Sequence, residues 1–179
     1  MPLTAVYHAV TGHVLGALAL TGADTPTGVG AVVGDALPLR VPLDKDDALV
    51  TLPLAARDLA VLAADDEPAA LDRPLDFGVV KGPEADAVPK PTLLRLADWS
   101  DGITLGTTGV TIKLPVATNR VTQVVAVVSD GEGTHVLTGS LVAQQTEVTL
   151  PLTLTSNAVH GVLVLAAGWA GRLQQETVT

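Results

Sequence analysis

Hydrophobic residues recur along this chain in short runs of Val, Leu, Ala and Thr, separated by clusters of Gly, Pro, Asp and Asn. Short apolar runs bounded by turn-forming residues are typical of β strands. The pattern predicts strands at residues 3–10, 13–21, 29–33, 36–42, 48–54, 59–64, 93–97, 110–116, 122–129, 134–143, 147–154 and 159–167. The clearest hairpin signal is the segment 129–133, because its Asp-Gly and Glu-Gly pairs tolerate positive φ. The spacing of these strands predicts an all-β protein with a β-sandwich-like arrangement.

The middle of the chain does not follow this pattern of short apolar runs. Prolines stand there among acidic residues: Pro68, Pro74, Pro83, Pro89 and Pro91. Because proline cannot donate a hydrogen bond to a β ladder, we expect residues 66–92 to form a linker or an ordered crossover. Within it, only the run 75–80 is a candidate edge strand. This segment would join an N-terminal β domain, residues 1–65, to a C-terminal β-sandwich-like domain with a C-terminal tail, residues 93–179.

One pentapeptide, Val-Thr-Leu-Pro-Leu, occurs twice, at residues 50–54 and 148–152. Each copy is followed by an aliphatic run, at 59–64 and 162–167. Duplication of a small β domain would explain the repeat, and it predicts that the two copies occupy equivalent sheet positions. Chance similarity between strands rich in Val, Leu and Thr is the other explanation.

The composition indicates a hydrophobic core that contains few aromatic side chains. Hydrophobic residues make up 47% of the chain but aromatic residues only 2%, so the apolar content is nearly all Val, Leu and Ala. Such a chain needs a core of many interlocking aliphatic side chains. The same excess would also be explained by surface that is buried against other subunits.

Charge and cysteine content narrow the choice of partners. The net charge is −9 and the ten Lys and Arg residues are scattered, which argues against nucleic acid and anionic membranes as partners. The chain has no cysteine, which excludes disulfides and thiolate metal sites. Its longest apolar runs are too short to span a membrane, and its first residues lack signal-peptide features. We therefore expect a protein of the cytoplasm or of an assembled particle.

The search for catalytic chemistry yields no motif. A Gly-x-Ser-x-Gly elbow is missing, and His8, His13, His135 and His160 lack the spacing of a zinc-ligand pair. The last three precede aliphatic runs, so we expect half-exposed positions on a sheet surface. The acidic turns at 44–47 and 65–67 lack the calcium-loop pattern and are interpreted as solvated turns. We expect no catalytic residue, no cofactor and no metal.

Interface residues are the remaining candidates. Trp99 stands in an acidic turn and Trp169 between small residues, and each would serve as a partner anchor or as a cap on the core. Arg172 is the only cation of the segment 168–179. Because that segment follows the last strong strand without an evident sheet partner, we expect it to contact other subunits.

Together these observations predict a non-enzymatic structural protein that is one subunit of a larger homo- or hetero-oligomeric assembly. Bacteriophage tails and contractile injection particles are examples by analogy only. One alternative is a ligand- or carbohydrate-binding β-sandwich module, although carbohydrate clefts usually need more aromatic side chains. The other alternative is a hydrolase with a carboxylate or His site.

Overall fold

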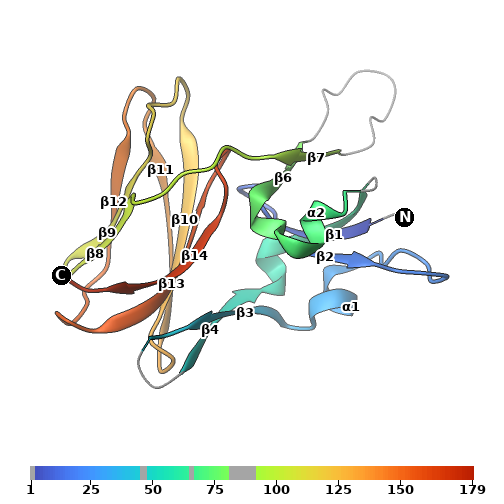
Figure 1. The fold of residues 1–179 in the computed structure, drawn as a ribbon, viewed down its shortest axis with the longest axis horizontal. Helices are drawn as coiled ribbons and strands as arrows, with labels where there is room; N and C mark the ends of the chain where they lie inside the picture. Colours follow the sequence, from blue (N-terminus) through green and yellow to red (C-terminus); the bar gives the residue numbers. More distant parts are fainter. Residues whose placement is uncertain (1–2, 45–47, 65–66, 81–91) are drawn as a thin grey trace. The chain divides into compact units, whose positions relative to one another are not determined.

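A computed structural model describes residues 3–44, 48–64, 67–80 and 92–179 of the chain. Its strands are β1 (Leu3–His8), β2 (Val14–Ala19), β3 (Ala36–Pro42), β4 (Leu49–Ala55), β5 (Leu59–Ala64), β6 (Phe77–Val80), β7 (Thr92–Arg95), β8 (Ile103–Gly106), β9 (Gly109–Lys113), β10 (Thr122–Ser129), β11 (Thr134–Leu141), β12 (Glu147–Pro151), β13 (Val159–Ala166) and β14 (Arg172–Thr177). The helical turns are α1 (Val29–Val33), η1 (Ala56–Asp58), α2 (Ala69–Asp72) and η2 (Pro74–Asp76) (Figure 1). The predicted all-β class is confirmed. No helix in the described ranges is long and apolar enough to cross a membrane.

The chain divides into two compact units whose sequences interleave. Unit 1 comprises Met1–Leu37, Leu54–Ala97 and Gly168–Ala170, and unit 2 comprises Pro38–Pro53, Asp98–Ala167 and Gly171–Thr179. This division does not follow the boundaries expected from the sequence, because the β3–β4 pair groups mainly with the C-terminal strands. A strand's period shows that it has a buried face, but it does not show which sheet that face meets.

The expected linker is partly folded. Residues 67–80 form α2, η2 and β6, and β6 pairs antiparallel with β7, as the edge-strand prediction for 75–80 required. Pro74 begins η2, where the missing N–H costs little. The rest of the expected linker, residues 66 and 81–91, lies outside the described residues.

Unit 1 is built around the three-stranded antiparallel sheet β2-β1-β5. Its core joins Ala5 and Val14 of this sheet to Ala70 of α2 and Phe77 of β6. The segment 29–33, expected to be a strand, is the short helix α1. Gly34, at φ 68°, ends α1 and donates its N–H to the Gly30 carbonyl, so local turn geometry overrides the β preference of the valines.

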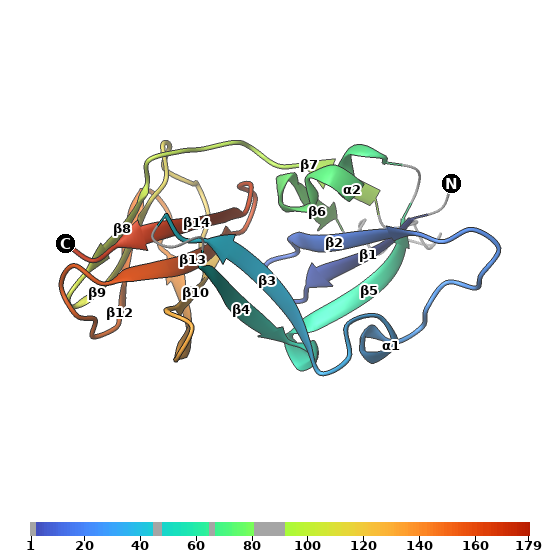
Figure 2. The same cartoon turned by 60° about the horizontal axis from the view of Figure 1, so that its bottom comes forward.

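Unit 2 contains the four-stranded sheet β11-β10-β13-β14, the three-stranded sheet β12-β9-β8 and the two-stranded sheet β3-β4. Strands β10 and β13 lie side by side in the centre of the four-stranded sheet and are buried on both faces (Figure 1). On one face, a Cβ on Gly139 of β11 would collide with Leu150 of β12. On the other face, a Cβ on Gly161 of β13 would lie 3.1 Å from Leu52 of β4. Strands β3 and β4 can be followed in Figure 2. The four-stranded sheet is therefore the middle of three layers.

The two copies of the repeated pentapeptide occupy different positions, so the duplication prediction is not supported. The first copy lies in β4 of the two-stranded layer, and the second lies at and after β12, on the edge of the three-stranded sheet. What they share is local: Leu52 and Leu150 are buried, while the prolines that follow them are exposed. Alternating burial with proline at a sheet edge explains the likeness of the two copies.

The C-terminal segment has a sheet partner, contrary to expectation. Strand β14 pairs antiparallel with β13 along its length, with Leu173 opposite Leu163, and Val178 beyond it is only 1% exposed. Gln175 accepts a hydrogen bond from the Asp44 N–H at 2.8 Å, which ties β14 to the end of β3. The polar residues of β14 made it resemble a tail, but they lie at the edge of a sheet, where polar side chains are tolerated.

Candidate functional site

Two histidines at the β1–β2 turn of unit 1 belong to a buried polar network. His13 is fully buried, and its Nε2 donates a hydrogen bond to the Trp169 carbonyl at 2.7 Å. A carbonyl can only accept, so a neutral His13 must accept at Nδ1, which lies 2.9 Å from the Thr11 hydroxyl. The Thr11 N–H donates to His8 Nδ1 at 3.3 Å. The expectation of a half-exposed His13 is therefore wrong, and the network fixes the turn.

Burial also sets the protonation of this network. It lowers the pKa of His13 to about 4, and the hydrogen bond to Trp169 opposes this only in part. Burial lowers the pKa of His8 as well, although the nearby Asp58 carboxylate raises it. Both imidazoles are thus held neutral around pH 7, because the fold gives little solvation to a proton on either ring.

We expect acid to destabilise unit 1 through His13. The pKa is 6.5 for a free imidazole and about 4 in the fold, so the unfolded chain takes up the proton first as the pH falls. The free energy of unfolding should decrease between about pH 6.5 and about pH 4, by about 3 kcal/mol from this group. Urea unfolding of wild type and His13→Gln across that range measures the difference in slope. The exposed His135→Gln is the matched control and should keep the wild-type slope; equal slopes in all three chains would contradict the prediction.

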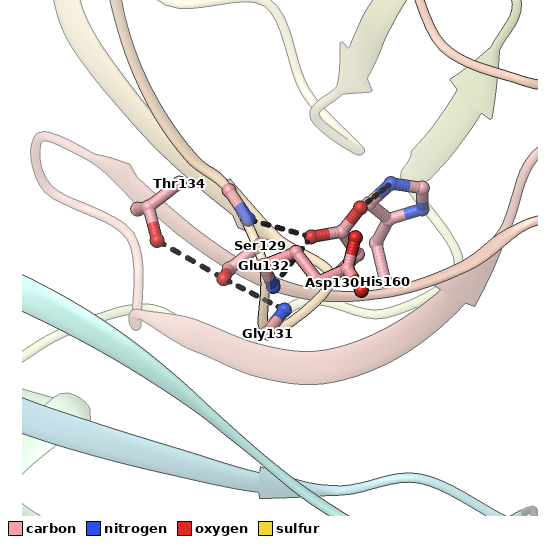
Figure 3. A network of polar contacts seen from close by, with 7 residues as sticks. Ser129, Asp130, Gly131, Glu132, Thr134 and His160 are labelled. Carbon is pink, nitrogen blue, oxygen red and sulfur yellow. Dashed lines mark hydrogen bonds and ion pairs between the residues drawn. The ribbon is translucent and has the colours of Figure 1, made fainter.

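The β10–β11 turn of unit 2 carries a second polar cluster, formed by Ser129, Asp130 and the neighbouring His160 (Figure 3). Asp130 Oδ1 accepts hydrogen bonds from the N–H groups of Gly133 and Glu132, at 2.8 and 2.9 Å. These bonds, that of Gly133 first, hold the pKa of the Asp130 carboxyl below its usual range. The predicted hairpin at 129–133 is confirmed, and Gly131 supplies its positive φ of 95°.

These residues do not have the geometry of a catalytic triad. Ser129 lies opposite Gly161, so the adjacent His160 side chain points to the other face of the sheet. The Ser129 hydroxyl accepts hydrogen bonds from the Gly131 N–H and the Thr134 hydroxyl, on the side away from the imidazole (Figure 3). His160 Nε2 is 4.0 Å from Asp130 Oδ2, and its Nδ1 has no hydrogen-bond partner among the described residues. His160 is 5% exposed, so the expectation of a half-exposed position is wrong here too.

The three interface candidates from the sequence differ in exposure, and Trp169 belongs to unit 1 whereas Trp99 and Arg172 belong to unit 2. Trp99 is only 5% exposed, and its ring packs against Gly102 within unit 2. Trp169 is half-buried in unit 1, where its carbonyl accepts the hydrogen bond from His13. Arg172 lies 3.9 Å from the exposed Asp98 carboxylate, a surface pair of small energetic value. Trp99 therefore packs into the core of unit 2, and the interface roles of all three candidates stay predictions.

Two surface depressions have linings that share no residue with these polar clusters. In unit 1 a depression of about 180 Å³ is lined by Ala69, Asp72, Arg73, Asp76, Phe77 and Arg95. In unit 2 one of about 300 Å³ is lined by Ser100, Asp101, Lys113, Leu114, Pro115 and Thr146. Neither includes a histidine, and both are at or below the lower end of typical ligand pockets, roughly 300–1,000 Å³. No group of His, Asp and Glu in the described ranges is arranged to hold a metal ion.

The most distinctive surface in unit 2 is strand β11, one edge of the four-stranded sheet. Its pairing with β10 runs from Thr134 to Leu141 without a bulge. Ala167 donates its N–H to the carbonyl of Gln123, and Asp130 to that of Gly133. Hydrogen-bonded pairs alternate with non-bonded pairs along an antiparallel ladder. The Asp130–Gly133 bond therefore places the odd-numbered residues of β11 in hydrogen bonds to β10. The Ala167–Gln123 bond agrees with this, because it shows that the odd-numbered residues of β10 bond to β13 instead. The even-numbered residues of β11 therefore point their N–H and C=O groups away from the sheet.

Those even-numbered residues also have exposed side chains: Thr134, Val136, Thr138 and Ser140. Val136 is 53% exposed, and Val121, which precedes β10, and Val142, which follows β11, are 56% and 54% exposed. Within the described part of the chain, β10 is the only ladder partner of β11. The strand thus offers both unpaired backbone groups and an exposed row of mostly β-branched side chains.

Two other sheet edges of unit 2 are protected in ways that β11 is not. Strand β14 carries Arg172 and Glu176, and β12 carries Glu147 and Pro151. Charges and prolines at such positions oppose pairing with other chains. Strand β11 contains no Asp, Glu, Lys, Arg or Pro. Among the uncharged edge strands of the described residues it is the longest, with eight residues against six in β2 and β5 and four in β6 and β8. It is therefore the edge best suited to accept another strand.

Sequence reasoning found β11 as a strand but missed it as a site. The signal was present, because residues 134–142 form an uncharged run directly after a clear hairpin turn. Its edge position depends on the sheet order, which periodicity does not show. Comparison of the chain with known proteins found no matching family model, no matching curated protein and no matching solved structure.

Proposed function

We propose that this chain is a non-enzymatic structural protein that assembles with other protein subunits into a larger particle, and that β11 is its main contact strand. The observation that carries the proposal is the uncharged, regular and unpaired edge of β11. Edge strands of this kind are the usual sites at which another chain extends a sheet, and natural monomers normally protect them. A subunit of a phage-tail-like particle is one setting in which such an edge would serve.

The alternatives receive less support from the geometry. A hydrolase would need a base within hydrogen-bond reach of its nucleophile, but Ser129 and His160 lie on opposite faces of one sheet. A ligand-binding module would need a pocket with convergent polar groups, whereas the two depressions are small and lie away from the buried polar clusters.

A charged residue on β11 should weaken assembly and leave the fold intact. Thr138→Lys places an ammonium group on the exposed face of the edge strand, beside the position of a paired strand, and charged side chains on an edge strand oppose pairing. We expect self-association to weaken about tenfold or more, which corresponds to about 1.4 kcal/mol. Sedimentation velocity measures the mass, and thermal unfolding checks the fold.

The matched control is Thr51→Lys, at an exposed position on the outer face of β4. It adds the same charge to the same unit but leaves β11 unchanged, so it should assemble as wild type does. A wild-type chain that stays monomeric at every concentration, with the same mass as Thr138→Lys, would contradict the proposal.

A further inference from the structure

The identity of the strand that pairs with β11 can be inferred from the geometry of its free edge; this step rests on the proposed function above. A second copy of the chain presents the same strand, and self-pairing places no like charges opposite one another, because β11 carries none. This matters for a chain of net charge −9, whose copies otherwise repel each other.

Charge at the two ends of the strand favours an antiparallel arrangement. The turn before β11 carries the exposed Glu132, whereas the opposite end carries the exposed Arg120, just before β10. An antiparallel pair of β11 strands brings the acidic turn of one copy to the end that bears Arg120 of the other. A parallel pair would instead place Glu132 beside its own copy.

The alternation of the backbone limits the register. Only Thr134, Val136, Thr138 and Ser140 present outward N–H and C=O groups, so these residues must face one another across the contact. The register that pairs all of them places Val136 opposite Thr138, and Thr134 opposite Ser140, of the second copy. Leu137 then lies on the two-fold axis. Shifting the strands by one pairing step leaves either Thr134 or Ser140, depending on the direction of the shift, without a partner inside β11.

We propose that two copies of this chain associate through antiparallel β11–β11 pairing, with Val136 of each copy opposite Thr138 of the other. The contact forms about eight backbone hydrogen bonds. It joins two four-stranded sheets into one continuous sheet. The interface is isologous, as in most two-fold dimers, because the same strand serves both subunits.

The absence of cysteine from the chain makes disulfide trapping a clean test of this register. Equimolar Val136→Cys and Thr138→Cys chains are mixed and oxidised, and linked dimers are identified by mass. Residues opposite each other in such a ladder have Cα atoms about 5.5 Å apart, within the range of a disulfide. Thr134→Cys with Ser140→Cys tests the second pair, and both pairs use exposed positions that should tolerate cysteine.

The matched control is Val136→Cys mixed with Ser140→Cys. In the proposed register Val136 faces Thr138, so Ser140 lies two residues further along the facing strand. We expect at least about fivefold more linked dimer from each in-register pair than from this control. Circular dichroism confirms that each variant is folded before oxidation.

Three other outcomes would overturn the inference, and they separate it from the proposed function. Preferential linking of the control pair would mean that another register is used. Assembly of the wild-type chain without linking at any β11 pair would mean that β11 binds a different strand or that another surface assembles, so self-pairing fails. A chain that neither assembles nor links would contradict the proposed function as well.

Discussion

A chain that ends at Gly171 should fail to fold in unit 2. This truncation removes β14, whose residues pair with β13 from Val159 to Val164, and it uncovers side chains that are fully buried in the intact protein, including Val162 and Leu163. Burial of each such side chain contributes about 1.5–3 kcal/mol. With the ladder bonds also lost, we expect destabilisation of about 5 kcal/mol or more, which is comparable to the whole stability of many domains.

Thermal unfolding followed by circular dichroism measures this effect. A chain that lacks only Thr179 is the control, because it keeps β14 and loses one backbone hydrogen bond to Leu105. The control should lose about 1 kcal/mol. If the longer truncation melted like the full chain, β14 would behave as a detachable tail, as the sequence had suggested.

The second large effect is expected from Gly102→Ala. A Cβ at this position would collide with the Lys113 carbonyl oxygen and would lie 2.7 Å from the Trp99 ring. The Gly102 carbonyl also accepts the Lys113 N–H at 2.7 Å, so the backbone cannot move away without losing a hydrogen bond. Because one of the obstructing groups is backbone, we expect a loss of about 3 kcal/mol or more.

Gly106→Ala, in the adjacent strand β8, is the matched control for this prediction. Its Cβ would meet nothing closer than 3.7 Å, an ordinary contact distance. It should therefore change the free energy of unfolding by less than about 1 kcal/mol. Equal effects of the two substitutions in urea unfolding would show that Trp99 does not pack on Gly102 as described.

The sequence predicted much of the local structure because a strand and a tight turn depend on neighbouring residues. The β10–β11 hairpin is the clearest case, since its turn is specified by Asp130, Gly131 and Gly133. Most other strands appear near their predicted ranges. The predicted strand at 29–33 is instead α1, where glycines on both sides of the valines allow a helical turn, and β8 and β14 were not predicted.

Features that depend on contacts distant in the sequence were not predictable. His13 and His160 each precede an aliphatic run, and nothing in that pattern shows that segments far along the chain bury the imidazole. The polar β14 is a strand only because β13 offers it an edge. The importance of β11 likewise comes from its place in the sheet order, which local periodicity does not fix.

The contact role of β11 is the central claim, and amide hydrogen exchange measures it most directly. Exchange is compared between dilute and concentrated protein and is read at individual residues. Amides of the odd-numbered residues from His135 to Leu141 should be protected in both samples, because they bond to β10. Amides of Val136, Thr138 and Ser140 should exchange freely when dilute and become protected, by about tenfold or more, on assembly. If those outward amides exchanged equally fast in monomer and assembly, β11 would not be the contact strand.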